Sequence, residues 1–236
     1  FNVLGTLSDA RYTNNPLAQV NYEGMNAGTI AELNQWKNPV TGENMPLQVL
    51  AKGMRTNGTP LTALSFGLNY NINGWFFEIN ANYYDRVYID FSEYRRLGNI
   101  VTAPTNSGKS WAVVSTEEDL VTFIKSQDVK DNSGIAFDQE GNILATRAAE
   151  QEKCKGGWML DLSIGKYNRM KKGKSLSINL QVQNLTNNCN MKTGGYEQNR
   201  DDNYSSGYAK AYVFSKNPKY YYANALNAFL NIGFKF

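Results

Sequence analysis

The end of the chain alternates strictly between apolar and other residues, and this limits what the chain can fold into. Read back from Phe236, every second residue as far as Leu226 is apolar, while the positions between are mostly polar or small. The apolar row is Leu226, Ala228, Leu230, Ile232, Phe234 and Phe236. A period of two predicts a β-strand with one apolar and one mostly wet face. Either a protein core or lipid must cover the apolar face.

Four internal segments repeat this alternation, and a weaker sixth strand is predicted over 1–13. The apolar residues that the internal segments place on one face are Leu64, Phe66, Leu68, Tyr70, Trp75, Phe77, Ile79, Ala81, Tyr83, Trp158, Leu160, Leu162, Ile164, Leu176, Ile178, Leu180 and Val182. Beyond Asp85 the alternation continues through Val87, Ile89 and Phe91, which predicts that one strand projects past the others.

The opposite faces of these segments are polar. Their residues include Glu78, Asn80, Asn82, Asp161, Asn179, Gln181, Asn227 and Asn231. Such a row does not fit a dry core, because buried polar groups need hydrogen-bond partners. No stretch approaches the roughly 18 consecutive apolar residues of a membrane helix, and the mean hydropathy is −0.50. A helical membrane protein is therefore excluded, but a transmembrane β-barrel is not, because barrel strands are apolar only at alternate positions.

The connections between the predicted strands have two lengths. Short turns fall near 71–74 and 169–174, and long loops at about 14–59, 96–157 and 187–219. Short turns at one end and long loops at the other are typical of an antiparallel outer-membrane β-barrel. The alternative is an antiparallel β-sandwich with one face in a core, which predicts shorter strands and more even loops.

The length and the ends of the apolar rows also fit a membrane. A tilted strand crosses a bilayer in about 9 to 11 residues, and the row from Leu226 to Phe236 has that length. Aromatic residues at the row ends fit the girdles that form at membrane interfaces. They are Tyr70, Trp75, Tyr83, Trp158 and Tyr222.

Composition excludes several classes of function. The chain has no histidine, so it cannot build a histidine-based catalytic triad or a typical zinc site. Its net charge of +3 is small and dispersed, which does not fit binding of nucleic acid. We expect no enzyme activity, no cofactor and no metal site. Acidic loop residues do not follow EF-hand spacing; they are Asp128, Asp131, Asp138, Glu140, Asp201 and Asp202.

The middle long loop is predicted to have structure of its own. Ser115 and Glu118 form a capping-box pattern at the start of an amphipathic run, which predicts a short helix. The segment 134–146 predicts a hairpin that turns at Gly141 and Asn142. A loop that packs on itself is the simpler interpretation, and a surface that contacts substrate or a partner is the alternative.

Aromatic residues and two cysteines in the long loops are the remaining candidates. The aromatic candidates for ligand contact are Trp36, Tyr94, Trp111 and Tyr196. Their rings suit stacking on sugars or peptide side chains, but loop aromatics also serve in packing. Cys154 and Cys189 lie at the bases of two long loops on the same predicted side. A disulfide between them is chemically allowed in an envelope compartment if their Cα atoms come within about 7 Å.

Several segments resemble TonB-dependent outer-membrane receptors. The run "INLQVQNLTNN" contains Asn-Leu-Thr-Asn from Asn184 to Asn187, which resembles the Asn-Leu-x-Asn element of that family's penultimate strand. A loop and a terminal strand ending in Phe236 follow it. "GTPLTALSFGLNY", with Pro60 at the mouth of a strand, is similar to another recurring element. "TGGYEQNR" and "NPKYYYANALNAFLNIGFKF" are most similar to the SusC/RagA-type branch.

The resemblance covers essentially the whole chain and implies a fold. Members have an N-terminal plug domain and a barrel of about 22 strands, of which this chain would supply about the last six. The plug domain is not visible in this chain, which begins inside a strand-like segment, so we expect a mature or truncated product. Phe236 resembles the signal by which the barrel-assembly machinery recognises its substrates.

The resemblance also implies a function. Members of this branch import glycans or peptides through the outer membrane. A SusD-like surface lipoprotein captures the nutrient, and the TonB complex then drives displacement of the plug. The loops of this chain would be extracellular. Two alternatives remain open: a receptor-like barrel that scaffolds a surface complex without importing anything, and a soluble β-sandwich lectin or adhesin.

Overall fold

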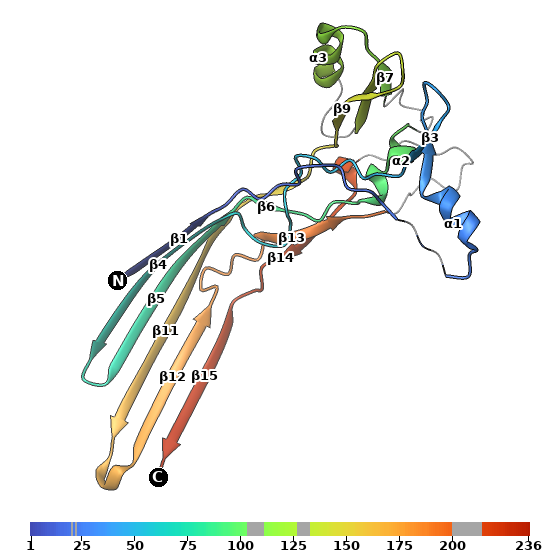
Figure 1. Ribbon diagram of the computed structural model, residues 1–236. Coiled ribbons are helices and arrows are strands. Elements are labelled where there is room, and N and C mark those ends of the chain that lie inside the picture. The colour runs from blue at the N-terminus through green and yellow to red at the C-terminus, as the bar shows by residue number, and fades with distance from the viewer. Residues whose placement is uncertain (20, 22, 103–110, 127–132, 200–213) are drawn as a thin grey trace.

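A computed structural model of the 236-residue chain shows an extended antiparallel sheet with a loop-rich region at one end (Figure 1). The structure describes all residues except 20, 22, 103–110, 127–132 and 200–213. The sheet has six strands in the order β1-β4-β5-β11-β12-β15. They are β1 (Asn2–Leu7), β4 (Thr62–Ile72), β5 (Trp75–Asp85), β11 (Gly157–Arg169), β12 (Ser175–Gln183) and β15 (Asn227–Lys235). The predicted all-β class is confirmed, and the weak first strand is present.

The strand register brings the predicted apolar residues together on one face. One row across the sheet runs from Tyr70 through Phe77, Ile164 and Leu180 to Leu230. Directly opposed residues share a face of an antiparallel sheet. The neighbouring row on the other face is mostly polar; it runs through Asn69, Glu78, Ser163, Gln181 and Phe229.

The apolar face is uncovered within the described part of the chain. The exposed fractions are 62% for Leu68, 63% for Leu230 and 62% for Ile232. Leu180 and Phe234, at 40% and 46%, are also exposed. A β-sandwich would require a second sheet over this face, and no described element lies there. The face is therefore far more apolar and more open than the surface of an ordinary soluble domain.

Two tight turns join the strands at the end of the sheet that points away from the loops, as predicted (Figure 1). Between β4 and β5, Asn73 and Gly74 have φ angles of 49° and 80°. Two such left-handed residues are typical of a two-residue hairpin. Between β11 and β12 the turn contains η2 (Lys171–Gly173), in which Lys172 has a φ of 62°.

The prediction of a longer strand beyond Asp85 is wrong. Arg86 has a φ of 54°, which a strand does not allow, and β5 ends before it. The next two residues form β6 (Val87–Tyr88), which pairs with β10 (Lys153–Cys154) in a separate small sheet. Val87, Ile89 and Phe91 are all buried, so their alternation reflects packing inside the loop region.

The Asn-Leu-Thr-Asn run fastens the exit of β12 to the entrance of β15. Asn184 and Asn187 both have positive φ angles, of 50° and 51°. The backbone N–H of Asn184 donates to Asp161 Oδ1 at 2.9 Å, and its Nδ2 donates to the carbonyl of Asn224 at 2.8 Å. The N–H of Leu226 donates to Asn187 Oδ1 at 3.0 Å. These bonds hold the two strand ends beside each other before β15 begins.

Three long connections gather at the other end of the sheet, and we call them together the loop region (Figure 1). They span 8–61, 86–156 and 184–226, so each begins earlier than predicted. Besides β6 and β10 they contain α1 (Ala27–Leu33), β2 (Gln35–Lys37), β3 (Asn44–Pro46), η1 (Tyr94–Arg96), α2 (Gly98–Thr102), β7 (Trp111–Val113), α3 (Glu117–Ser126), β8 (Gly134–Phe137), β9 (Ile143–Arg147), β13 (Lys192–Glu197), η4 (Phe214–Lys216) and β14 (Pro218–Tyr222). No helix among the described residues has the length and apolar character needed to cross a membrane.

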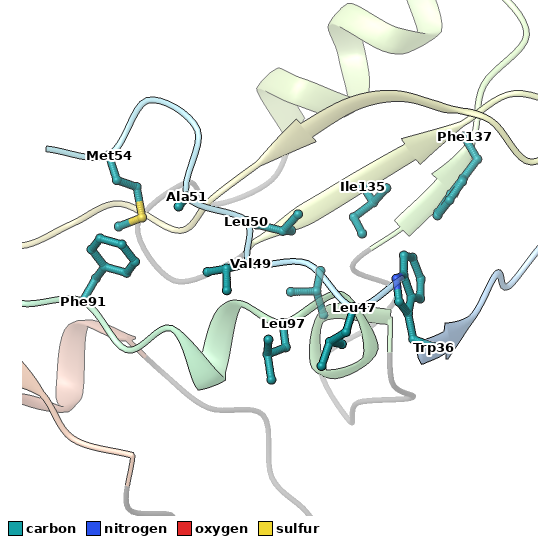
Figure 2. Packing of buried hydrophobic residues seen from close by; sticks show 11 residues of the cluster. Trp36, Leu47, Val49, Leu50, Ala51, Met54, Phe91, Leu97, Ile135 and Phe137 are labelled. Carbon is teal, nitrogen blue, oxygen red and sulfur yellow. The ribbon is translucent and has the colours of Figure 1, made fainter. Parts of the chain in front are cut away.

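The main hydrophobic core lies inside the loop region. It consists of Trp36, Leu47, Val49, Leu50, Ala51, Met54, Phe91, Leu97, Val101, Ile135 and Phe137. These residues come from the first two connections and meet between β2, α2 and β8 (Figure 2). Leu50, Ile135 and Phe137 are fully buried. Burial of such a side chain contributes about 1.5–3 kcal/mol, so the loops form a packed structure.

The predicted helix and hairpin of the middle connection are confirmed. The strands β8 and β9 form a hairpin whose turn contains Gly141, with a φ of 84°. The helix α3 follows the predicted run, but its cap lies one residue later than expected. Thr116 Oγ1, and not Ser115, accepts a hydrogen bond from the backbone N–H of Asp119, at 3.1 Å.

Replacing the capping residue should therefore loosen α3. We expect Thr116→Ala to destabilise the helix by about 1 kcal/mol, because an amide of the first turn loses its acceptor. Hydrogen exchange of the α3 amides measures this as an increase of about fivefold in the opening equilibrium. The control is Ser115→Ala, for which we expect little change in α3; equal effects of the two substitutions would contradict the assignment.

Candidate functional site

A pocket of about 760 Å³ opens in the loop region between the segment after β6 and the strands β13 and β14. Its lining residues are Asn57, Gly58, Asp90, Phe91, Ser92, Glu93, Tyr94, Thr193, Gly194, Gly195, Tyr196, Glu197, Asn199 and Tyr221. A volume of this size and a mixture of aromatic and polar side chains are typical of sites for small ligands.

Backbone pairing builds two walls of the pocket. The strands β13 and β14 pair with each other, and Asp90 forms a parallel bridge to Tyr196. The N–H of Asp90 donates to the carbonyl of Gly195 at 2.8 Å, and the N–H of Glu197 donates to the carbonyl of Asp90 at 2.9 Å. Segments from the second and third connections are thereby held together, which fixes the pocket from both sides.

Three tyrosine rings line the pocket and remain exposed. The exposed fractions of Tyr94, Tyr196 and Tyr221 are 48%, 41% and 58%. The ring centroids of Tyr196 and Tyr221 are 6.1 Å apart. Amide side chains of Asn57 and Asn199 also line the space. Exposed rings beside amides offer stacking and hydrogen bonding to a ligand such as a sugar or a peptide.

The structure brings two of the four aromatic candidates together and places the other two elsewhere. Tyr94 and Tyr196 line the same pocket. Trp36 is 4% exposed, and its Nε1 donates to the carbonyl of Pro46 at 3.2 Å. Trp111 is partly buried, with its ring 6.3 Å from that of Phe137. Both tryptophans therefore pack in or against the core of the loop region.

Sequence reasoning missed Tyr221 and Asp90 as lining residues. Tyr221 is the middle residue of the Tyr-Tyr-Tyr run in β14, so strand alternation separates it from Tyr220 and Tyr222. Tyr222, expected at the end of an apolar row of the sheet, lies instead in the loop region. The alternation of side chains within 218–222 could have separated Tyr221 from its neighbours. The position of Asp90 depends on long-range pairing and had no local signal.

A buried ion pair supports the wall formed by β13. Arg96 is fully buried, and its Nη2 donates to Glu197 Oε1 at 2.8 Å while Nη1 donates to Oε2. The guanidinium also donates to the carbonyls of Ser92 and Ala149, at 3.2 Å and 3.3 Å. Its Cζ lies 4.3 Å from the ring centroid of Phe214. One side chain thus joins the second and third connections beneath the pocket.

Charged groups of both signs lie at the pocket. Asp90 and Glu93 line it, and Arg95 contacts two lining residues: its Cζ is 5.7 Å from the ring centroid of Tyr94, and its Nη2 donates to the carbonyl of Asn199. Partial burial raises the pKa of Asp90, and the nearby Glu197 carboxylate raises it further, while a hydrogen bond from the backbone of Phe91 acts in the opposite direction.

The cysteines are both free thiols, so the disulfide that the sequence allows is not formed. Cys154 is buried in β10 with Sγ 3.9 Å from the carbonyl of Gly194, and burial raises the pKa of its thiol. Cys189 follows β12, and its Sγ lies 3.1 Å from Asn187 Oδ1. Each sulfur therefore has a local polar contact in place of a partner sulfur.

The acidic loop residues do not gather into a metal site in the part of the chain that the structure covers. Asp138 accepts hydrogen bonds from the backbone and the side chain of Asn142, and so closes the β8–β9 turn. Glu140 lies in the same turn. Four other positions, Asp128, Asp131, Asp201 and Asp202, lie outside the described residues.

Comparisons with known proteins add no relative. No family model, no curated protein and no solved structure matches the chain.

Removing the buried carboxylate should weaken the loop region strongly. We expect Glu197→Gln to lower its stability by about 3 kcal/mol, because the charge of Arg96 is then buried without a counter-ion. The matched control is Glu93→Gln, which removes an equal charge from an exposed position in the same pocket and should change stability by less than about 0.5 kcal/mol. Limited proteolysis of the loops at increasing temperature measures the difference, and similar protease resistance in both variants would refute it.

Proposed function

We propose that the chain forms part of the wall of an outer-membrane β-barrel that imports a nutrient by a TonB-dependent mechanism. The observation that carries the proposal is the apolar face of the six-stranded sheet, which the described chain leaves open while the opposite face is polar. In water such a face is unfavourable by about 25 cal/mol for each Å² of apolar surface. Hydrocarbon outside and water or a plug inside would suit both faces.

The dimensions of the apolar face support a membrane position. On β11 the face extends from Trp158 to Lys166, which is about 27 Å along the strand. At a barrel tilt of about 40° this becomes roughly 20 Å, close to the apolar band of outer-membrane barrels. Aromatic residues mark its two ends: Trp158 packs on Tyr83 with centroids 5.0 Å apart, and Trp75 stacks on Phe77 at 6.1 Å.

The edges of the sheet support a larger barrel. In the described structure β1 and β15 each pair on one side only. Unpaired N–H and C=O groups are several kcal/mol unfavourable in lipid, so membrane sheets close. Single-chain bacterial barrels have at least about eight strands, so six are too few. We propose that further strands pair with both edges, as in the 22-stranded receptors that the sequence resembles.

The pocket in the loop region is the proposed point of nutrient contact. With the short turns on the periplasmic side, the loop region faces the outside of the cell. Tyr94, Tyr196 and Tyr221 would hold a glycan or a peptide by stacking. A SusD-like lipoprotein would cover this side, and Phe236, exposed at the other end, would serve in barrel assembly.

A charge on the apolar face should block membrane insertion. We expect Leu230→Arg to destabilise the inserted protein by about 2–4 kcal/mol, because Leu230 lies near the middle of the apolar rows. The matched control is Asn231→Arg, because Asn231 lies on the polar face of the same strand. We expect this variant to insert like the wild type. Resistance of the membrane-bound protein to carbonate extraction measures insertion. Release of the wild type by carbonate without detergent would support the soluble alternative.

The tyrosines of β14 give a matched pair for the pocket. We expect Tyr221→Ala to weaken ligand binding by about fivefold to tenfold, since a stacked aromatic ring contributes about 1 kcal/mol. Tyr222→Ala, on the other face of the strand, should leave binding unchanged. Anisotropy of labelled neutral oligosaccharides and of labelled peptides measures binding to the purified protein. Equal losses in both variants would count against the pocket, and binding without uptake by cells would favour the scaffold alternative.

A further inference from the structure

We propose that the turn end of the sheet binds the phosphate groups of anionic glycerophospholipids. The inference rests on the proposed membrane position of the sheet and adds a lipid-binding site to it. Three exposed lysines of the turn between β11 and β12 carry the proposal: Lys171, Lys172 and Lys174. We call them the basic strip.

A closed turn brings the basic strip together. It begins after Arg169, which pairs with Ser175 as the last pair between β11 and β12. The three lysines lie in the turn between β11 and β12. There the N–H of Met170 donates to the carbonyl of Lys174 at 2.8 Å. The closed turn holds the three charges within five residues of the chain.

No acidic side chain lies near the basic strip in the described structure. All three lysines are exposed, and none of them forms an ion pair. The nearest carboxylate along the polar face is that of Glu78, which opposes Ser163. Ser163 is six residues from Arg169 on β11, or about 20 Å, beyond the screening length of about 8 Å at physiological salt.

The depth of the basic strip matches lipid headgroups. Trp75 marks the end of the apolar face and is 41% exposed. The Nζ of Lys166 lies 4.5 Å from its ring centroid, as expected where hydrocarbon meets water. The strand ends at Arg169, three residues or about 10 Å further along, and a tilt of about 40° reduces this depth to roughly 8 Å. Headgroups occupy about 5–7 Å on each side of the hydrocarbon, so the turn begins at their outer edge.

Of the two tight turns of the sheet, only the one between β11 and β12 carries charge. The neighbouring turn between β4 and β5, residues 71–74, contains no charged side chain. Lysine side chains bind phosphate as point charges, and each one near an anionic surface increases binding by about fivefold. We therefore expect lipid to be retained beside β11 and β12 and not beside β4 and β5.

Lipid analysis of the reconstituted protein tests the proposal. The intact protein is inserted into phosphatidylcholine vesicles that contain a minor fraction of phosphatidylglycerol, extracted in mild detergent, and analysed for bound lipid by mass spectrometry. We expect the bound lipid to be enriched several-fold in phosphatidylglycerol relative to the vesicle. In the variant Lys171→Gln/Lys172→Asn/Lys174→Gln, we expect the enrichment in phosphatidylglycerol to be at least threefold lower than in the wild type. Asparagine is used at 172 because it tolerates the left-handed conformation found there.

The control variant removes three exposed lysines from the loop region, as Lys37→Gln/Lys52→Gln/Lys155→Gln. It should retain the full enrichment. No enrichment in the wild type, or equal loss in both variants, would overturn the inference while leaving the proposed function intact. Failure of the wild type to insert into vesicles would overturn the proposed function, and the lipid site with it.

Discussion

The uncovered apolar face of the sheet is the constraint on which the rest of the structure depends. Rows of Leu, Ile, Phe and Trp side chains cross the strands β4 to β15 in register, and no described element packs on them. A sheet of this kind is unfavourable in water and favourable in hydrocarbon. The opposite face is polar, aromatic residues lie at the ends of the apolar rows, and the cationic turn lies beyond one of these ends. These features agree with the orientation that we propose for the sheet.

The loop region needs a hydrophobic core of its own to stay ordered. Its connections are long, and ordering long loops costs conformational entropy that a few turns could not offset. Packed residues such as Leu50, Ile135 and Phe137 supply a core, and Arg96 ties the second connection to the third through Glu197. The pocket with Tyr196 and its neighbours lies on this support. A rigid binding surface loses less entropy when a ligand binds.

The sequence was most informative where structure is local. Alternation located all six strands, and helical spacing located α3, because both patterns depend on a few neighbouring residues. The same alternation misled beyond Arg86, where burial in the loop core imitates a strand face. Tyr94 and Tyr196 were found by residue type, but their meeting depends on the bridge to Asp90, between positions far apart in the chain. No local pattern encodes such a contact.

The left-handed residues at the rim of the sheet have an evolutionary consequence. Arg86 ends β5 and Asn184 ends β12 by their own backbone conformation, and Asn187 holds the start of β15 through a hydrogen bond from Leu226. Insertions or deletions further out in the second and third connections would leave the register of these strands unchanged. Loop sequences can then diverge among descendants of one ancestral gene while the sheet stays the same.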